Sequence, residues 1–135
     1  MNEFKRNIPQ KILDKDFLDG NEFGCRKSDF EEVINLARKN SLAIIGGQVQ
    51  YALPDAICEL YWVSYDPEER KATESWKTYC ERSAKECLEK FHSIIRKDDI
   101  QQQALEGFKV LKEKRNAGIN IDEFQTFIIY FEFEK

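Results

Sequence analysis

The stretch 41–66, "SLAIIGGQVQYALPDAICELYWVSYD", constrains the fold of this chain more than any other part of the sequence. β-Branched and aromatic residues dominate it, and Pro54-Asp55 near its middle predicts a turn between two antiparallel strands. A loop with an even number of residues keeps apolar and polar side chains on separate faces, because a slip by one residue exchanges the faces. The favoured register pairs Ala52 with Ile57, Tyr51 with Cys58, Gln50 with Glu59, Val49 with Leu60, Gln48 with Tyr61 and Gly47 with Trp62.

This register predicts one apolar and one polar face for the hairpin. The apolar face carries Ile45, Gly47, Val49, Tyr51, Cys58, Leu60 and Trp62. The polar face carries Gln48, Gln50, Glu59 and Tyr61.

The triplet Gly46-Gly47-Gln48 matches the catalytic loop of peptide-release factors, but little else in the sequence supports that activity. Glycine inside a strand is typical of a bulge or of a close approach by another group. Since the register places Gly47 opposite Trp62, we expect the indole ring to lie across the bare glycine backbone. The triplet therefore predicts backbone geometry and no catalytic role.

Helical patterns flank the hairpin on both sides. Before it, Ser28 and Glu31 form a capping-box pattern that predicts a helix over about 29–39. Residues 1–27 are harder to interpret and predict at most one short helix that ends near Gly20.

After the hairpin, Ser75 is a candidate cap for a long helix over about 76–96. Its apolar residues recur at a period of about 3.6, which is typical of a helix with one buried face. A further helix is expected to begin at Asp98 or Asp99 and to end near Gly118, which suits a left-handed C-cap.

The C-terminal segment "FQTFIIYFEFEK" alternates between two sets of side chains, which predicts a strand. Together these patterns predict an α+β fold in which an antiparallel sheet of three or more strands, with a central hairpin, is packed on one face by helices. A length of 135 residues suits a single domain over 1–135.

Composition excludes several classes of protein. No window approaches ~18 consecutive apolar residues, and the first 30 residues lack the apolar core of a signal peptide, so we expect a cytoplasmic protein without a membrane span. The net charge of −4 disfavours a nucleic-acid partner, which requires a clustered basic face, and favours a basic protein partner. In a reducing cytosol, the four cysteines are expected to remain free thiols.

Neither a catalytic set nor a metal site is predicted. Cys80 and Cys87 lack the close spacing of zinc ligands and fall on the apolar stripe of the long helix, where thiols serve as small core residues. His92, the single histidine, is expected on the helix surface, and no cofactor is implied.

The acidic group over residues 55–69 is the candidate partner-binding site. Carboxylates and tyrosines occur together here, a combination that suits an interface with a basic protein, although exposed Tyr and Glu on a sheet are also common without any function. The predicted contact residues are Gln48, Gln50, Asp55, Glu59, Tyr61, Asp66, Glu68 and Glu69.

The run "AIIGGQVQYALPDAICELYWVSYDPEER" followed by "ESWKTYCERSAKECLEKF" resembles the immunity proteins of bacterial polymorphic-toxin and contact-dependent growth inhibition systems. The resemblance covers about half of the chain. It is carried by Gly46-Gly47-Gln48, Leu53-Pro54-Asp55, Glu59-Leu60-Tyr61-Trp62 and Glu74-Ser75-Trp76.

The resemblance implies a cytoplasmic, non-enzymatic protein that binds a cognate toxin C-terminal domain and occludes its active or substrate-binding surface. Many such toxins are nucleases with basic clefts, which an acidic protein can occupy. In solution the chain would be a monomer or a weak homodimer.

Two alternatives remain open on the sequence. The first is a small enzyme or small-molecule-binding protein with a pocket between sheet and helices. The second is a subunit that forms a homo-oligomer through the aromatic C-terminal strand, whose exposed edge would otherwise favour aggregation.

Overall fold

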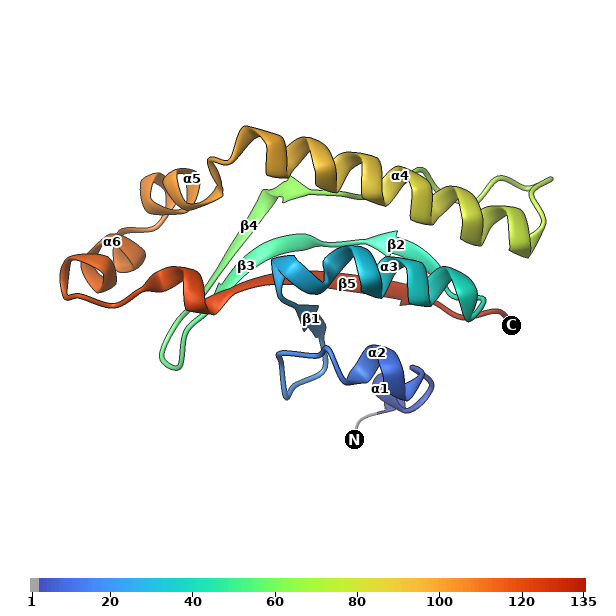
Figure 1. The fold of residues 1–135 in the computed structure, drawn as a ribbon, viewed down its shortest axis with the longest axis horizontal. Coiled ribbons are helices and arrows are strands. Elements are labelled where there is room, and N and C mark those ends of the chain that lie inside the picture. The colour runs from blue at the N-terminus through green and yellow to red at the C-terminus, as the bar shows by residue number, and fades with distance from the viewer. Residues whose placement is uncertain (1–2) are drawn as a thin grey trace.

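The computed structural model describes residues 3–135, with side chains from Lys5 onward, and confirms the α+β class. Five antiparallel strands form the sheet in the order β1-β5-β3-β4, and β2 also pairs with β5 (Figure 1). The strands are β1 (Phe23–Cys25), β2 (Ala43–Gly46), β3 (Gln48–Ala52), β4 (Ile57–Ser64) and β5 (Gln125–Glu132).

The C-terminal strand β5 lies at the centre of the sheet. Its residue Phe127 is opposite Cys25 of β1 on one side and opposite Val49 of β3 on the other. β1 pairs with Phe127–Ile129 on one edge of β5, and β3 and β2 pair with the other edge, so that Phe127 and Phe131 are buried. These two rings are therefore not presented at an exposed edge, as the homo-oligomer alternative supposed. The short strand β1 was not predicted from residues 1–27.

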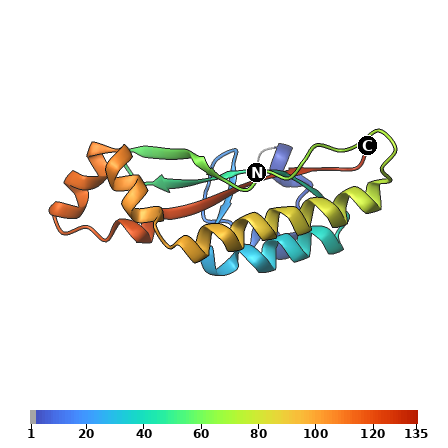
Figure 2. The ribbon, with the colours of Figure 1, turned by 90° about the horizontal axis from the view of Figure 1, so that it is seen from above.

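Two helices lie side by side across one face of the sheet (Figures 1 and 2). The longer, α4 (Trp76–Lys97), begins where the sequence predicts, and the Ser75 side chain accepts a hydrogen bond from the Thr78 N–H. Its neighbour α3 (Phe30–Lys39) follows the 3-10 helix η1 (Lys27–Asp29).

The predicted capping box at the start of α3 does not form. Ser28 lies inside η1, and no side chain caps α3 by a hydrogen bond. Glu31 instead contacts His92 of α4, with 2.7 Å between Oε1 and Nε2. The exposed histidine therefore links the outer surfaces of the two helices.

The segment after α4 forms two short helices where one was predicted. These are α5 (Ile100–Gly107) and α6 (Lys109–Asn116), and Phe108 between them is extended, with φ −134° and ψ 109°. Gly118 ends α6 at φ +93°, with its N–H bonded to Arg115 O and the next N–H bonded to Lys114 O.

Three short helices complete the chain. The 3-10 helix η2 (Ile121–Phe124) leads into β5. Near the N-terminus, α1 (Glu3–Arg6) and α2 (Gln10–Leu13) lie beyond β1, on the side of the molecule away from α4 (Figure 1).

The hairpin register is confirmed for four pairs, from Ala52↔Ile57 to Val49↔Leu60. The next pair is Gln48↔Ser64, so three residues of β4 bulge out between consecutive pairs. The expected pairs Gln48–Tyr61 and Gly47–Trp62 are therefore wrong. A bulge leaves extra residues unpaired and redirects the side chains that follow it, which a regular two-residue alternation cannot predict.

The bulge turns Trp62 outward, onto α5. The indole ring is 55 % exposed, its Nε1 donates to Gln103 Oε1 at 2.8 Å, and it stacks on Phe108 with 6.1 Å between ring centroids. It does not cover Gly47 as we expected.

Other groups do approach the backbone of Gly46 and Gly47 closely, but Trp62 is not one of them. A Cβ on Gly47 would lie 1.8 Å from Ile128 O and 3.0 Å from the Tyr65 ring, and φ is +156° there. The Gly47 N–H donates to Asp66 Oδ1 at 2.9 Å. The glycine pair thus allows the chain to continue from β2 to β3 along β5, with Asp66 bonded to the freed amide.

Aromatic rings fill the core between the sheet and the helices. Phe30 stacks on Phe91 at 4.1 Å between centroids and meets Tyr65 and Phe127 edge-on. The four cysteines are free and buried, and burial raises the pKa of each thiol, that of Cys87 to about 12. Within residues 3–135, no helix is long and apolar enough to cross a membrane.

Candidate partner-binding face

The sheet face opposite α3 and α4 carries a group of polar side chains. Alternation along β3, β4 and β5 directs them away from the aromatic core. We call this group the sheet-face cluster, and it consists of Glu22, Gln48, Gln50, Glu59, Tyr61 and Tyr130.

Hydrogen bonds join most of the cluster. Gln48 Nε2 donates to the Tyr130 hydroxyl at 3.3 Å, and that hydroxyl donates to Glu22 Oε2 at 2.6 Å. The Tyr61 hydroxyl donates to Glu59 Oε2. Burial raises the pKa of Tyr130, and the hydrogen bond to Glu22 raises it further.

Gln50 is the member whose hydrogen bonding is incomplete. Its side chain is on the same face as that of Glu59, its direct cross-strand partner, and the residue is only 2 % exposed. Among residues 3–135, Gln50 Oε1 has no hydrogen-bond partner. A buried acceptor without a hydrogen-bond donor lowers the stability of the folded state by about 1–3 kcal/mol. Gln50 Oε1 is therefore an unsatisfied acceptor within the cluster.

Beside this acceptor, β4 presents large side chains to solvent. Ile57 and Tyr61 are each 66 % exposed, and Glu59 between them is half-buried. Ile57 and Glu59 share the face because they alternate along the strand, and the hydrogen bond from the Tyr61 hydroxyl to Glu59 places Tyr61 beside them. Aromatic residues are enriched in protein-binding surfaces, and exposed apolar side chains that lie together can mark an interaction site.

The structure brings together four of the eight predicted site residues: Gln48, Gln50, Glu59 and Tyr61. It also corrects the role of two of them, because Gln48 is 8 % and Gln50 2 % exposed. We expected both on an open polar face. The sheet continues past them into β5, and Glu22 lies alongside, so these amides lie below the surface and cannot contribute contact area directly.

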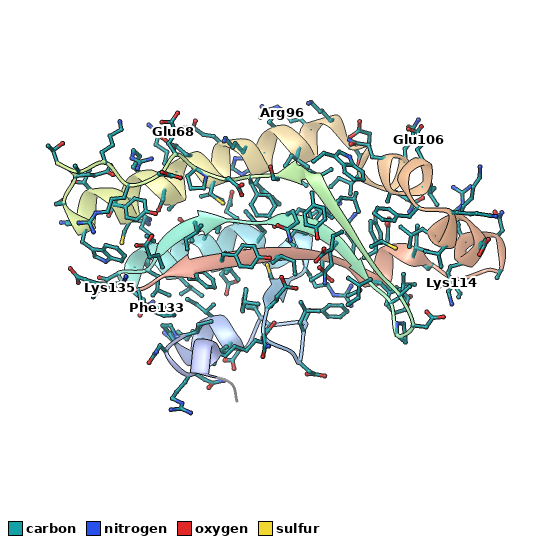
Figure 3. The ribbon with its side chains drawn as sticks, turned by 180° about the vertical axis from the view of Figure 1, so that it is seen from behind. Glu68, Arg96, Glu106, Lys114, Phe133 and Lys135 are labelled. Carbon is teal, nitrogen blue, oxygen red and sulfur yellow. The ribbon has the colours of Figure 1, made fainter. Side chains whose placement is uncertain are left out.

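The other four predicted residues lie elsewhere. Asp55, at the hairpin turn, pairs with Lys114 of α6 at 2.5 Å, and this hydrogen bond lowers the pKa of the carboxyl. Asp66 holds the Gly47 amide. Glu68 and Glu69 are exposed on the loop before α4, where Arg82 binds their backbone carbonyls. Figure 3 shows Glu68 and Lys114 toward opposite ends of the molecule.

Sequence reasoning did not include Glu22 and Tyr130 in the site. The alternation of β5 already separated Tyr130 from the buried phenylalanines. Nothing in the sequence could place Glu22, because its position depends on how the loop before β1 crosses the sheet.

Other features of the molecule offer weaker sites. An open groove of about 560 Å³ lies between α3 and α4, and its lining includes Arg38, Lys85 and Leu88 but neither His92 nor a cysteine. In the described part of the chain, no three potential metal-ligating side chains of His, Cys, Asp or Glu lie together.

No family model, curated protein or solved structure matches this chain. The assignment of a function therefore depends on the geometry and chemistry of its own surface.

Proposed function

We propose that this chain is a cytoplasmic immunity protein, without enzymatic activity, that binds a cognate toxin domain and occludes its active or substrate-binding surface. The proposal rests on one observation above all. The exposed part of β4 sets the Glu59 carboxylate between Ile57 and Tyr61, beside the buried acceptor of Gln50.

This arrangement suits recognition of a basic protein surface. Ile57 and Tyr61 supply area that binding removes from water, at about 25 cal/mol per Å². Glu59 supplies charge, and its position between them allows bound partner atoms to exclude water from the carboxylate. Charge pairs at such shielded positions contribute more than exposed pairs.

The remaining acidic residues would act at longer range. Asp66, Glu68 and Glu69 lie on the loop beyond the bulge, and the whole chain has a net charge of −4. A field of this sign accelerates encounter with a basic partner such as the substrate cleft of a nuclease. The partner would therefore be a basic toxin C-terminal domain, and the chain would act as a monomer or a weak homodimer.

The decisive experiment is co-expression with the toxin C-terminal domain encoded immediately upstream. We expect the chain to protect the cells and to co-purify with the domain. Cell death together with a failure to co-purify would remove the proposal.

Substitutions at the surface then locate the interface. A Glu59→Gln, Tyr61→Ala double variant should lose affinity by about a hundredfold or more, since both groups lie at the centre of the proposed contact. Glu106→Gln on α5 is the matched control, because it removes one exposed carboxylate elsewhere. If the double variant and the control bind with equal affinity, the interface does not lie on β4.

A further inference from the structure

β4 is an edge strand whose outer backbone groups lack a strand partner. In the described chain it pairs with β3 alone. The Leu53 N–H donates to Ala56 O at 2.9 Å, so the pair next to the turn is hydrogen-bonded. Such pairs alternate with non-bonded pairs in an antiparallel ladder.

Counting from the turn, the pairs Ala52↔Ile57 and Gln50↔Glu59 are the non-bonded ones. The N–H and C=O groups of Ile57 and Glu59 therefore point away from β3, toward the open edge. Natural sheets usually cover or disrupt an edge of this kind. Here the bulge, which begins at Tyr61, and the contact of Trp62 with α5 end the regular edge.

We propose that this edge, residues 57–61, pairs with an extended segment of the partner, and that this segment carries an arginine opposite Glu59. The inference rests on the proposed function and names the way in which the partner is held. Backbone hydrogen bonds to Ile57 and Glu59 would supply affinity, and the side chain opposite Glu59 would supply specificity.

The chemistry at Glu59 selects a cation with several donors. Tyr61 already occupies Oε2 of Glu59, which leaves Oε1 for a donor from the partner. A side chain opposite Glu59 on a paired strand has its Cβ about 4.5–5.5 Å from that of Glu59. A guanidinium group presents several N–H donors in a fixed plane that suits a carboxylate, whereas an ammonium acts as a point charge.

A second copy of this chain fits the edge less well. Antiparallel pairing about Glu59 would bring Ile57 against Tyr61 of the copy, but would also set the two Glu59 carboxylates directly opposite each other. Like charges in that position are destabilising. The charge at the centre of the edge therefore favours a foreign, basic strand.

The test uses the full chain and a synthetic peptide, acetyl-Thr-Val-Thr-Arg-Thr-Val-Thr-amide. In antiparallel register its arginine lies opposite Glu59 and its valines lie opposite Ile57 and Tyr61. We expect chemical-shift changes and slowed amide exchange at Ile57 and Glu59 on titration, followed by NMR. The matched peptide with glutamate in place of arginine should bind at least tenfold more weakly.

Two pairs of variants distinguish the contribution of the Ile57 backbone hydrogen bond to peptide binding from that of the Glu59 charge. Ile57→Pro removes an outward N–H that β3 does not use and should abolish peptide binding, while Ile57→Thr, which keeps that N–H, should stay within about threefold of the parent. Glu59→Gln should weaken binding about tenfold, and Glu106→Gln should leave it unchanged. Circular dichroism confirms that each variant is folded.

Equal binding of the two peptides, slowed exchange away from residues 57–61, or a homodimer protected along β4 would each overturn the inference. If the chain protects cells from the toxin but does not bind the arginine peptide, the proposed function stands and this inference is wrong. If the chain binds the peptide but does not protect cells in co-expression, the proposed function is wrong and the binding site at the β4 edge stands.

Discussion

At the scale of single residues, Gly47 shows how little room the centre of the sheet leaves. A Cβ there would meet the Ile128 carbonyl oxygen at 1.8 Å, and the backbone has φ +156°. The obstacle is main chain of the central strand, which cannot move aside as a flexible side chain could.

We expect Gly47→Ala to lower the free energy of unfolding by about 2–3 kcal/mol, because both the contact and the φ value oppose a side chain. Urea denaturation measures this change. Gly20→Ala is the control, since nothing lies within 4 Å of its added Cβ, and it should change stability by less than about 1 kcal/mol. A similar loss in both variants would contradict the role given to Gly47.

Glu74 is a second residue with a specific physical role. Its Oε2 lies 2.6 Å from Nε of Arg82, and this hydrogen bond lowers the pKa of the carboxyl from 4.5 to about 2. A folded-state pKa below the unfolded value means that the contribution to stability is present above about pH 4.5. It is then lost as the pH falls toward 2.

We therefore expect the stability difference between the parent and Glu74→Gln to be constant near neutral pH and to shrink between about pH 4.5 and 2. Denaturation curves recorded across this range provide the measurement. In an Arg82→Gln background the Glu74→Gln difference should lose this pH dependence. Persistence of the dependence without Arg82 would show that another group causes it.

At the scale of elements, the bulge in β4 gives two neighbouring aromatic residues different roles. Tyr61 faces solvent beside Glu59, whereas Trp62 stacks on Phe108 and donates to Gln103. Trp62 therefore docks α5 against the sheet, although it is more than half exposed.

We expect Trp62→Ala to cost about 1–2 kcal/mol of stability and to accelerate amide exchange in α5, because a ring stack and a hydrogen bond are lost. Tyr61→Ala should cost less stability but more partner affinity. Thermal denaturation, hydrogen exchange and binding assays together distinguish the two variants. Equal losses of stability would show that the bulge does not separate these roles.

At the scale of the whole molecule, charge is distributed unevenly with respect to the proposed contact. Glu59 lies at its centre, while Glu68 and Glu69 lie on an exposed loop before α4. Exposed charges act mainly through long-range attraction, which salt screens over about 8–10 Å.

We expect the double variant Glu68→Gln, Glu69→Gln to bind the toxin domain between about threefold and tenfold more slowly at low salt, with an unchanged dissociation rate. The difference from the parent should disappear as ionic strength rises. Stopped-flow kinetics measures both rates. A change confined to the dissociation rate would place these residues in direct contact with the partner.

The sequence by itself determined the α+β class, the long helix over Trp76–Lys97, the C-terminal strand and the first four pairs of the hairpin. These features depend on local periodicity, capping and turn chemistry, which neighbouring residues encode. Four of the candidate site residues also followed from that periodicity, since alternation alone assigns side chains to a face of a strand.

Only the tertiary structure decided the rest. The bulge at residues 61–63, the burial of Gln48 and Gln50, and the approach of Glu22 to Tyr130 all depend on segments distant in the chain. Whether a polar strand residue reaches solvent is decided by what lies beside it in the sheet. Here β5 occupies that position, and the open edge of β4 with its carboxylate is what remains for a partner.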